Sequence, residues 1–203
     1  MTSALDVAKY LIELAGREPD EAEPITHLRL QKLLYYAQGW HLGLFGRSLF
    51  AEPVLAMKAG PVVSRVSEVV MGVLGDNLAR PLTAADLGPS NLVAREKVFL
   101  ETIWQKYRAY SATGLKELSQ AEMPWSDARA GLPHMEEASA EITADSLRRF
   151  FASRPEARVV PFATLEAVYE AEAEDREANR KGVPFEELRR RRRVAAIAGQ
   201  EQT

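Results

Sequence analysis

The sequence predicts a mainly α-helical protein: a single compact helical domain around one buried central helix, a short β-hairpin near residues 49–58, and a C-terminal helical extension. Two observations support this fold class. Apolar residues recur at helical spacing in successive segments, and the segment from Thr26 to Gly46 is apolar on two sides. A third observation, the change of composition after about Arg154, predicts two parts, residues 1–153 and residues 154–203.

Composition limits the classes of protein to consider. The 203 residues are 46% apolar with a formal net charge of −3, which is ordinary for a globular chain and does not favour general nucleic-acid binding. The sequence holds no cysteine, which excludes disulfides and thiolate sites. We find no secretory signal and no apolar run of about 18 residues or more, so we expect a cytoplasmic protein without membrane contact.

The first helix begins at Ser3, whose hydroxyl can cap the first turn, and ends near Gly16. Its apolar face is formed by Val7, Tyr10, Leu11 and Leu14. A polar loop with Pro19 and Pro24 follows. The spacing of apolar residues therefore predicts one amphipathic helix before the central one.

The central helix begins at its cap Thr26 and ends at Gly46. One stripe is apolar and carries Leu30, Leu33, Leu34, Ala37, His41 and Leu44. A second stripe carries Lys32, Tyr36 and Trp40, with Gly39 and Gly43 nearby to let another backbone come close. We expect one stripe to face the core and the second to face a partner.

After the hairpin, Gly60-Pro61 predicts a helix start, because proline suits the first helical position. The valines that follow would favour a strand by composition, but their spacing is helical; they are Val62, Val66, Val69, Val70 and Val73. Residues 76–91 form a connecting segment with one short helical turn.

Three more helices are expected, starting at caps Asn91, Ser111 and Thr143. Met123-Pro124-Trp125 breaks the second of them. Their inward residues are Leu100, Ile103, Trp104, Tyr107, Leu115, Leu118, Leu147, Phe150 and Phe151.

The sequence does not favour an enzyme, a metal site or a cofactor. His27, His41 and His134 have no partner at metal-ligand spacing, and nucleophile and phosphate-loop motifs are missing. His41 is therefore best interpreted as a hydrogen-bonded core or interface histidine. Tyr35, Tyr36 and Trp40 are interpreted as core aromatics, with a binding platform as the alternative.

The C-terminal part predicts a solvated helix and a basic tail. Its arginine run is the candidate contact for nucleic acid or an acidic partner, although the overall acidic balance weighs against nucleic acid; the run comprises Arg189, Arg190, Arg191, Arg192 and Arg193.

Residues 30–41, LQKLLYYAQGWH, resemble the signature of the SocA-type antitoxins, also called the Panacea domain and found in GepA-like phage-associated proteins. The resemblance continues through residues 58–63, KAGPVV, residues 103–107, IWQKY, and Pro124-Trp125, and it covers about Val7 to Phe151. Met57, Ala59, Ser67 and Gln120 depart from the usual pattern, and if those positions contact the toxin in relatives, the choice of partner differs here.

What the resemblance implies is an antitoxin that neutralises a protein toxin, encoded by an adjacent gene in a prophage or mobile element, through direct contact. The toxin-contact candidates are Lys32, Tyr35, Tyr36, Trp40, His41, Lys58 and Trp125, with Lys32, Tyr36 and Trp40 expected on the exposed face. The structural signature comprises Leu30, Gln31, Leu33, Gly39, Gly60, Pro61, Val62 and Pro124. Two alternatives stay open: an adaptor that delivers the toxin to a cytoplasmic AAA+ protease, and a nucleic-acid-binding autoregulator.

Overall fold

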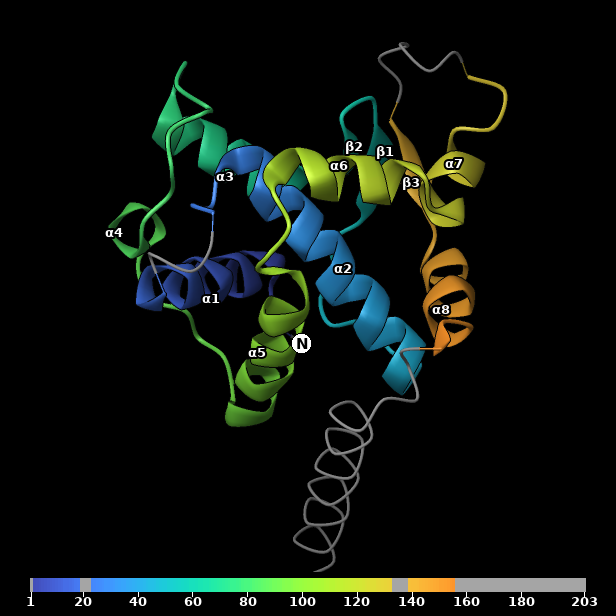
Figure 1. Ribbon diagram of the computed structural model, residues 1–203, viewed down its shortest axis with the longest axis horizontal. Coiled ribbons are helices and arrows are strands. Elements are labelled where there is room, and N and C mark those ends of the chain that lie inside the picture. Colours follow the sequence, from blue (N-terminus) through green and yellow to red (C-terminus); the bar gives the residue numbers. More distant parts are fainter. Residues whose placement is uncertain (1, 19–22, 133–138, 156–203) are drawn as a thin grey trace, which may run out of the picture. The chain divides into compact units, whose positions relative to one another are not determined.

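The computed structural model describes residues 2–18, 23–132 and 139–155. The chain divides into two units, Met1–Ala163 and Thr164–Thr203, and all described residues lie in the first. These residues form a mainly α-helical fold with a small sheet (Figure 1). In order, the elements are α1 (Ala4–Arg17), α2 (His27–Phe45), β1 (Val54–Met57), β2 (Gly60–Val63), α3 (Ser64–Leu74), α4 (Ala84–Leu87), α5 (Ala94–Tyr107), α6 (Ala112–Gln120), α7 (Met123–Ala128), β3 (Ala140–Ile142) and α8 (Ala144–Ala152).

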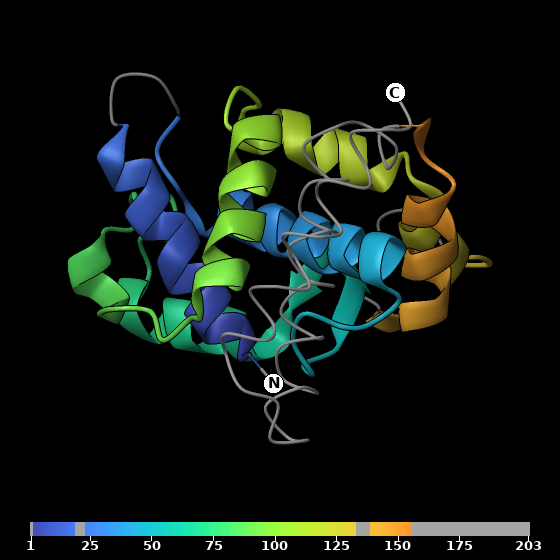
Figure 2. The same cartoon turned by 90° about the horizontal axis from the view of Figure 1, so that it is seen from below.

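Helix α2 is the buried central helix that the sequence predicts. Thr26 caps it by accepting the Arg29 amide at 3.4 Å, and Gly46 ends it with φ +65°. Every residue from Arg29 to Leu42 is buried, because α1, α5, α6, α8 and the sheet surround the helix (Figures 1 and 2). These elements are therefore packed around α2.

Helix α8 packs against α2 at the two glycines. A Cβ atom at Gly39 would lie 2.1 Å from the Phe151 ring, and one at Gly43 would lie 2.8 Å from the backbone nitrogen of Ala152. The expectation that small residues here admit another backbone is confirmed at Gly43, whereas at Gly39 the space is taken by the Phe151 ring. Phe151 also contacts the rings of Tyr35, Tyr36 and Trp40, so α8 completes the aromatic core.

The three strands form one antiparallel sheet in the order β2-β1-β3. The predicted hairpin exists, but it spans residues 54–63, and β3 was not predicted. Pro61 is not the first residue of a helix: it lies in β2, opposite Ala56, and α3 begins only at Ser64. An edge strand tolerates a proline, and the β-branched valines around it favour the extended backbone.

The predicted starts of α1, α6 and α8 are confirmed by hydroxyl caps at Ser3, Ser111 and Thr143. Asn91 is not a cap, since α5 starts at Ala94 and the Glu96 carboxylate accepts the Val93 amide at 3.1 Å. Residues 123–125 do end α6, but they also open the short helix α7, which has proline in its first turn.

The predicted C-terminal extension, including Arg189 to Arg193, lies outside the described residues apart from its first two positions. Among the helices that the structure describes, none has the length and apolar character that a bilayer crossing would need.

Candidate functional site

The second stripe of α2 is not an exposed face. The side chains of Lys32, Tyr36 and Trp40 are fully buried, with 0% exposure, so the expectation that they form an open binding surface is wrong. A helix with two apolar stripes exposes one of them only when too few neighbouring elements are present to cover both. Here α6, α8 and β2 cover the second stripe, and its polar atoms make hydrogen bonds inside the fold.

Lys32 holds the end of the β1–β2 hairpin. Its ammonium donates to the carbonyl of Pro61 at 2.7 Å. A Cβ atom at Gly60 would lie 2.9 Å from Lys32 Cε and 3.3 Å from the Ser119 hydroxyl, and the φ of Gly60 is +93°. The positive φ therefore favours glycine there, and a Cβ atom would also displace the end of the Lys32 side chain. Burial, with a smaller contribution from the charge of Lys116, lowers the pKa of Lys32 to about 7.

Two glutamines of α2 act as backbone partners. Gln31 accepts the amide of Val63 at 2.8 Å, which satisfies an N–H of edge strand β2. Gln38 accepts the amide of Leu49 at 2.9 Å and donates to the carbonyl of Phe50 at 3.0 Å. These buried amides connect α2 to the segments on both sides of β1.

Three side chains from the α6–α7 region donate to three consecutive carbonyls of the hairpin. Arg129 donates to Ala56 at 3.1 Å, Trp125 to Met57 at 3.0 Å, and Gln120 to Lys58 at 2.8 Å. With Lys32 they form what we call the turn clamp: Lys32, Gln120, Trp125 and Arg129. The turn clamp holds the hairpin backbone from helices α2, α6 and α7 and the residue after α7.

Glu122 is a buried carboxylate between α6 and α7. The hydroxyl of Tyr35 donates to it at 2.7 Å, that of Tyr36 lies at 3.5 Å, and the Arg154 guanidinium lies 3.9 Å away. Burial and the Glu122 charge raise the pKa of both tyrosines, so both hydroxyls stay protonated and act as donors. Glu122 thus links the two tyrosines of α2 to the chain between α6 and α7 and to Arg154, which follows α8.

The remaining predicted α2 candidates also make internal bonds. Trp40 donates its indole N–H to the hydroxyl of Tyr107 at 2.8 Å. The Nδ1 atom of His41 lies 2.7 Å from the carbonyl oxygen of Arg47, and burial lowers the pKa of His41 to about 4. The interpretation of His41 as a hydrogen-bonded buried histidine, and of the three aromatics as core, is confirmed.

Sequence reasoning missed several buried polar residues. Gln38 could have been found, because it lies seven residues after Gln31 and therefore on the same helix face. Arg29 gave no signal: it is fully buried, donates to the Arg108 carbonyl at 2.7 Å and lies over the Trp104 ring at 5.4 Å. Glu122 was hidden because its tyrosine partners are 86 and 87 residues away.

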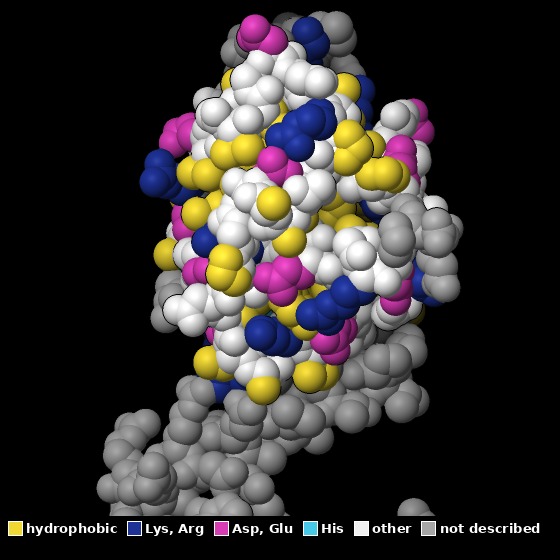
Figure 3. Space-filling view, turned by 90° about the vertical axis from the view of Figure 1, so that its left-hand side faces the viewer, with side chains coloured by type: hydrophobic (Ala, Val, Ile, Leu, Met, Phe, Trp, Pro, Cys, Tyr) yellow, Lys and Arg dark blue, Asp and Glu magenta, His cyan; other side chains and the backbone are white. Residues whose placement is uncertain are grey.

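The structure brings most of the predicted site residues together, but as scaffold. Among the candidates, Lys58 reaches the surface while Trp125 is 5% exposed. In the signature set Val62 is half-buried, and the other members with a side chain lie inside the fold; they are Leu30, Gln31, Leu33, Pro61 and Pro124. On one outer face, apolar, basic and acidic side chains are intermingled (Figure 3). Within the described ranges, no three histidine or carboxylate side chains are grouped as a metal site would require.

Comparison with known proteins gives one match. Residues 30–126 match the family model described as "Antitoxin SocA-like, Panacea domain". The matched segment runs from the start of α2 to α7 and contains the whole turn clamp except Arg129. No curated protein and no solved structure matches the chain.

Proposed function

We propose that this chain, whose residues 30–126 match the family model of the SocA-like Panacea domain, is the antitoxin of a toxin–antitoxin system and neutralises a protein toxin by binding it directly in the cytoplasm. The family match carries the proposal, because the description of the matched domain is that of an antitoxin. We propose that the toxin gene lies next to the gene for this chain.

The chemistry of the buried polar groups supports binding over catalysis. Lys32, Gln31 and Gln38 direct their polar atoms at backbone groups of the hairpin and its flanks, where they fix the shape of the chain. A rigid scaffold of this kind favours a binding protein, since neutralisation needs only tight and specific occlusion of a target.

The test is co-expression with the neighbouring open reading frame. We expect that frame to arrest growth when expressed alone and to be harmless when this chain is expressed with it. A Glu122→Ala variant, which removes the carboxylate between Tyr35 and Tyr36, should protect less well because the fold is weakened. A neighbour that is harmless alone, or that stays toxic with the wild-type chain, contradicts the proposal.

The adaptor alternative has a different readout. An adaptor for an AAA+ protease shortens the half-life of the toxin, whereas an occluding antitoxin leaves it unchanged or lengthens it. We propose occlusion, and a pulse-chase of the toxin in hosts with and without the protease distinguishes the two.

A further inference from the structure

The first turn of α2 meets the start of α3 at one ring nitrogen, Nε2 of His27. The Ser67 hydroxyl of α3 lies 3.0 Å from it, and the side-chain nitrogen of Gln31, one turn further along α2, lies 3.5 Å from it. The side-chain oxygen of Gln31 accepts the Val63 amide at 2.8 Å. Gln31 is buried, whereas His27 and Ser67 are half-buried, so these contacts join α2 to β2 and α3 within reach of solvent.

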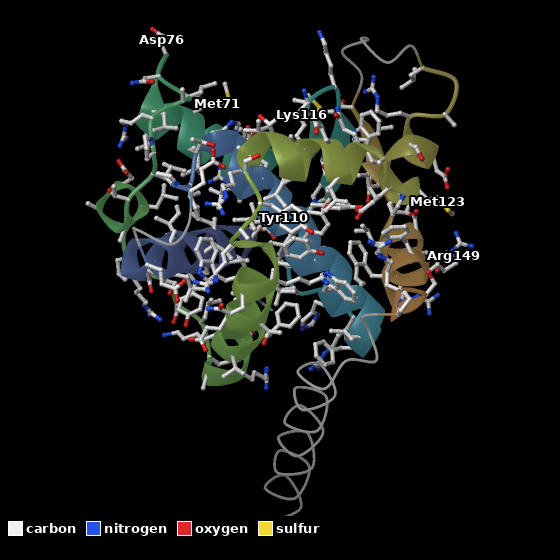
Figure 4. The ribbon with its side chains drawn as sticks, in the orientation of Figure 1. Met71, Asp76, Tyr110, Lys116, Met123 and Arg149 are labelled. Carbon is white, nitrogen blue, oxygen red and sulfur yellow. The ribbon has the colours of Figure 1, made fainter. Side chains whose placement is uncertain are left out.

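These partners decide which ring nitrogen of His27 carries the proton. Because the oxygen of Gln31 is engaged by Val63, its nitrogen faces the ring and can only donate, so Nε2 must accept. Ser67 then donates as well, since an unprotonated Nε2 has no hydrogen to give. The sulfur of Met71, labelled in Figure 4, lies 3.6 Å from the same hydroxyl but is a weaker acceptor than an imidazole nitrogen. The contacts therefore require a neutral His27 with its proton on Nδ1.

The charges around His27 do not offset a second proton on the ring. Among the described residues, Lys32 is the one charged group that shifts the pKa of His27, and it is a cation. Lys116 of α6, also labelled in Figure 4, acts in turn on Lys32. On α3, Arg65 and Glu68 pair with each other at 3.5 Å, and β2 has no charged residue. Carboxylates of the other neighbouring elements are engaged elsewhere: Asp6 and Glu13 of α1 accept the amides of Asn91 and Ser90, and Asp86 of α4 pairs with Arg80.

We propose that His27, Gln31 and Ser67 form a proton-sensitive contact, the His27 latch, which holds the β2–α3 junction on α2 only while His27 is neutral. A proton on Nε2 opposes the N–H group of Gln31 and adds a charge near that of Lys32. Gln31 cannot turn its amide to accept this proton without releasing the Val63 amide. Acidification therefore loosens the end of β2 and the first turn of α3 before the rest of the fold.

The direction of the pH dependence follows from linkage. Burial, and secondly the charge of Lys32, lower the pKa of His27 in the closed latch below its ordinary value of 6.5. A ring that has left the contact titrates near that ordinary value, so the open state binds more protons as the pH falls below 6.5. Opening is therefore favoured by acid and suppressed above pH 6.5.

The first experiment reads the tautomer in the wild-type chain, so it does not depend on the folding of a variant. The ¹⁵N chemical shifts of the imidazole ring distinguish a protonated from an unprotonated nitrogen. Near neutral pH we expect Nδ1 of His27 to carry the proton and Nε2 to carry none. A proton on Nε2 overturns the inference.

The second experiment changes the donor that faces the ring. Gln31→Glu keeps the shape of the side chain and one oxygen for the Val63 amide, while its other oxygen accepts from a protonated Nε2. We expect the NMR titration midpoint of His27 to rise by about one pH unit or more, which is about tenfold tighter proton binding. Ser126→Glu, at an exposed position of α7, adds the same charge as a control and should leave the midpoint unchanged. Equal midpoints in Gln31→Glu and the wild type overturn the inference.

The third experiment asks whether the opening is local. Hydrogen exchange in the wild type compares the amide of Val63 with that of Phe151 in α8. Between pH 6.5 and pH 5.5 the protection of Val63, corrected for the intrinsic exchange rate, should fall by up to about fivefold, and that of Phe151 by less. An equal fall at both amides, or none at Val63, overturns the inference. No toxin enters any of these measurements, so their failure leaves the proposed antitoxin function standing.

Discussion

Lys32 and Pro61 are joined across 2.7 Å by a hydrogen bond between a buried ammonium and a strand carbonyl. The carbonyl lies 29 residues further along the chain, and Gly60 leaves the space through which the lysine reaches it. This contact replaces the backbone partner that an edge strand lacks on that side. It also places a cation where water cannot solvate it, and the first prediction follows from that cost.

Stability should rise with pH between pH 7 and pH 9. The pKa of Lys32 is about 7 in the folded protein and near 10.5 when exposed, so the unfolded chain binds more protons throughout this window. For these two pKa values, raising the pH from 7 to 9 adds about 2 kcal/mol to the free energy of unfolding. Urea denaturation followed by circular dichroism at several pH values measures the slope.

Lys32→Met is the control for that slope. Methionine keeps most of the volume and removes the ionisable group, so the free energy of unfolding should become nearly independent of pH in the same window. If the variant retains the wild-type slope, another group causes it.

Gly39→Ala should destabilise the fold by about 1–3 kcal/mol, because the added methyl group would overlap the Phe151 ring. Gly72→Ala in α3 is the matched control. A Cβ atom there meets nothing within 4 Å, so this change should leave stability unchanged or raise it by about 0.5–1 kcal/mol. Thermal unfolding of both variants gives the comparison, and equal losses would contradict the close contact of α2 with α8.

Glu122→Ala should cost about 2–4 kcal/mol of unfolding free energy. The substitution leaves two buried tyrosine hydroxyls without their acceptor. It should also change the near-ultraviolet circular dichroism of the tyrosines. Glu117→Ala, at an exposed position of α6, should stay within about 0.5 kcal/mol of the wild type. A Glu122→Ala protein as stable as Glu117→Ala would contradict the role of this carboxylate.

His41 should remain neutral well into the acidic range. Its pKa of about 4 in the folded protein lies below the ordinary value of 6.5, so protons bind preferentially to the unfolded chain as the pH falls below 6.5. His41 therefore lowers stability progressively towards pH 4. NMR titration of the histidine ring protons measures the midpoint, and a midpoint near 6.5 would contradict the burial of this ring.

The helices were predictable because their signals are local. Ser111 and Thr143 cap at the expected positions, and the period of apolar residues in α2 identifies a buried helix without any tertiary information. Strand β3 was not predictable, because its pairing with β1 joins residues more than 80 positions apart. The error at Pro61 has a different cause: proline suits both the first turn of a helix and an edge strand, and only the tertiary position of β2 decides.

The candidate site was predicted as a set of residues but not as an arrangement. Lys32, Tyr36 and Trp40 do lie together on α2, yet the sequence cannot say that α6, α8 and β2 cover them. A polar group at the end of a long side chain suggests a solvent-exposed residue, although the same group can equally well donate a hydrogen bond inside the fold. The turn clamp needs Gln120, Trp125 and Arg129 to meet residues 56–58, and no local pattern links those two segments.

The contact of Phe151 with the two glycines of α2 has a consequence for how this domain can be transferred between proteins. The matched family segment ends at residue 126, whereas the ring that fills the space above Gly39 arrives 25 residues later. A gene fusion that carried residues 30–126 alone would expose an aromatic groove along α2 to solvent. The smallest segment that can be transferred is therefore longer than the matched segment, and it must include α8.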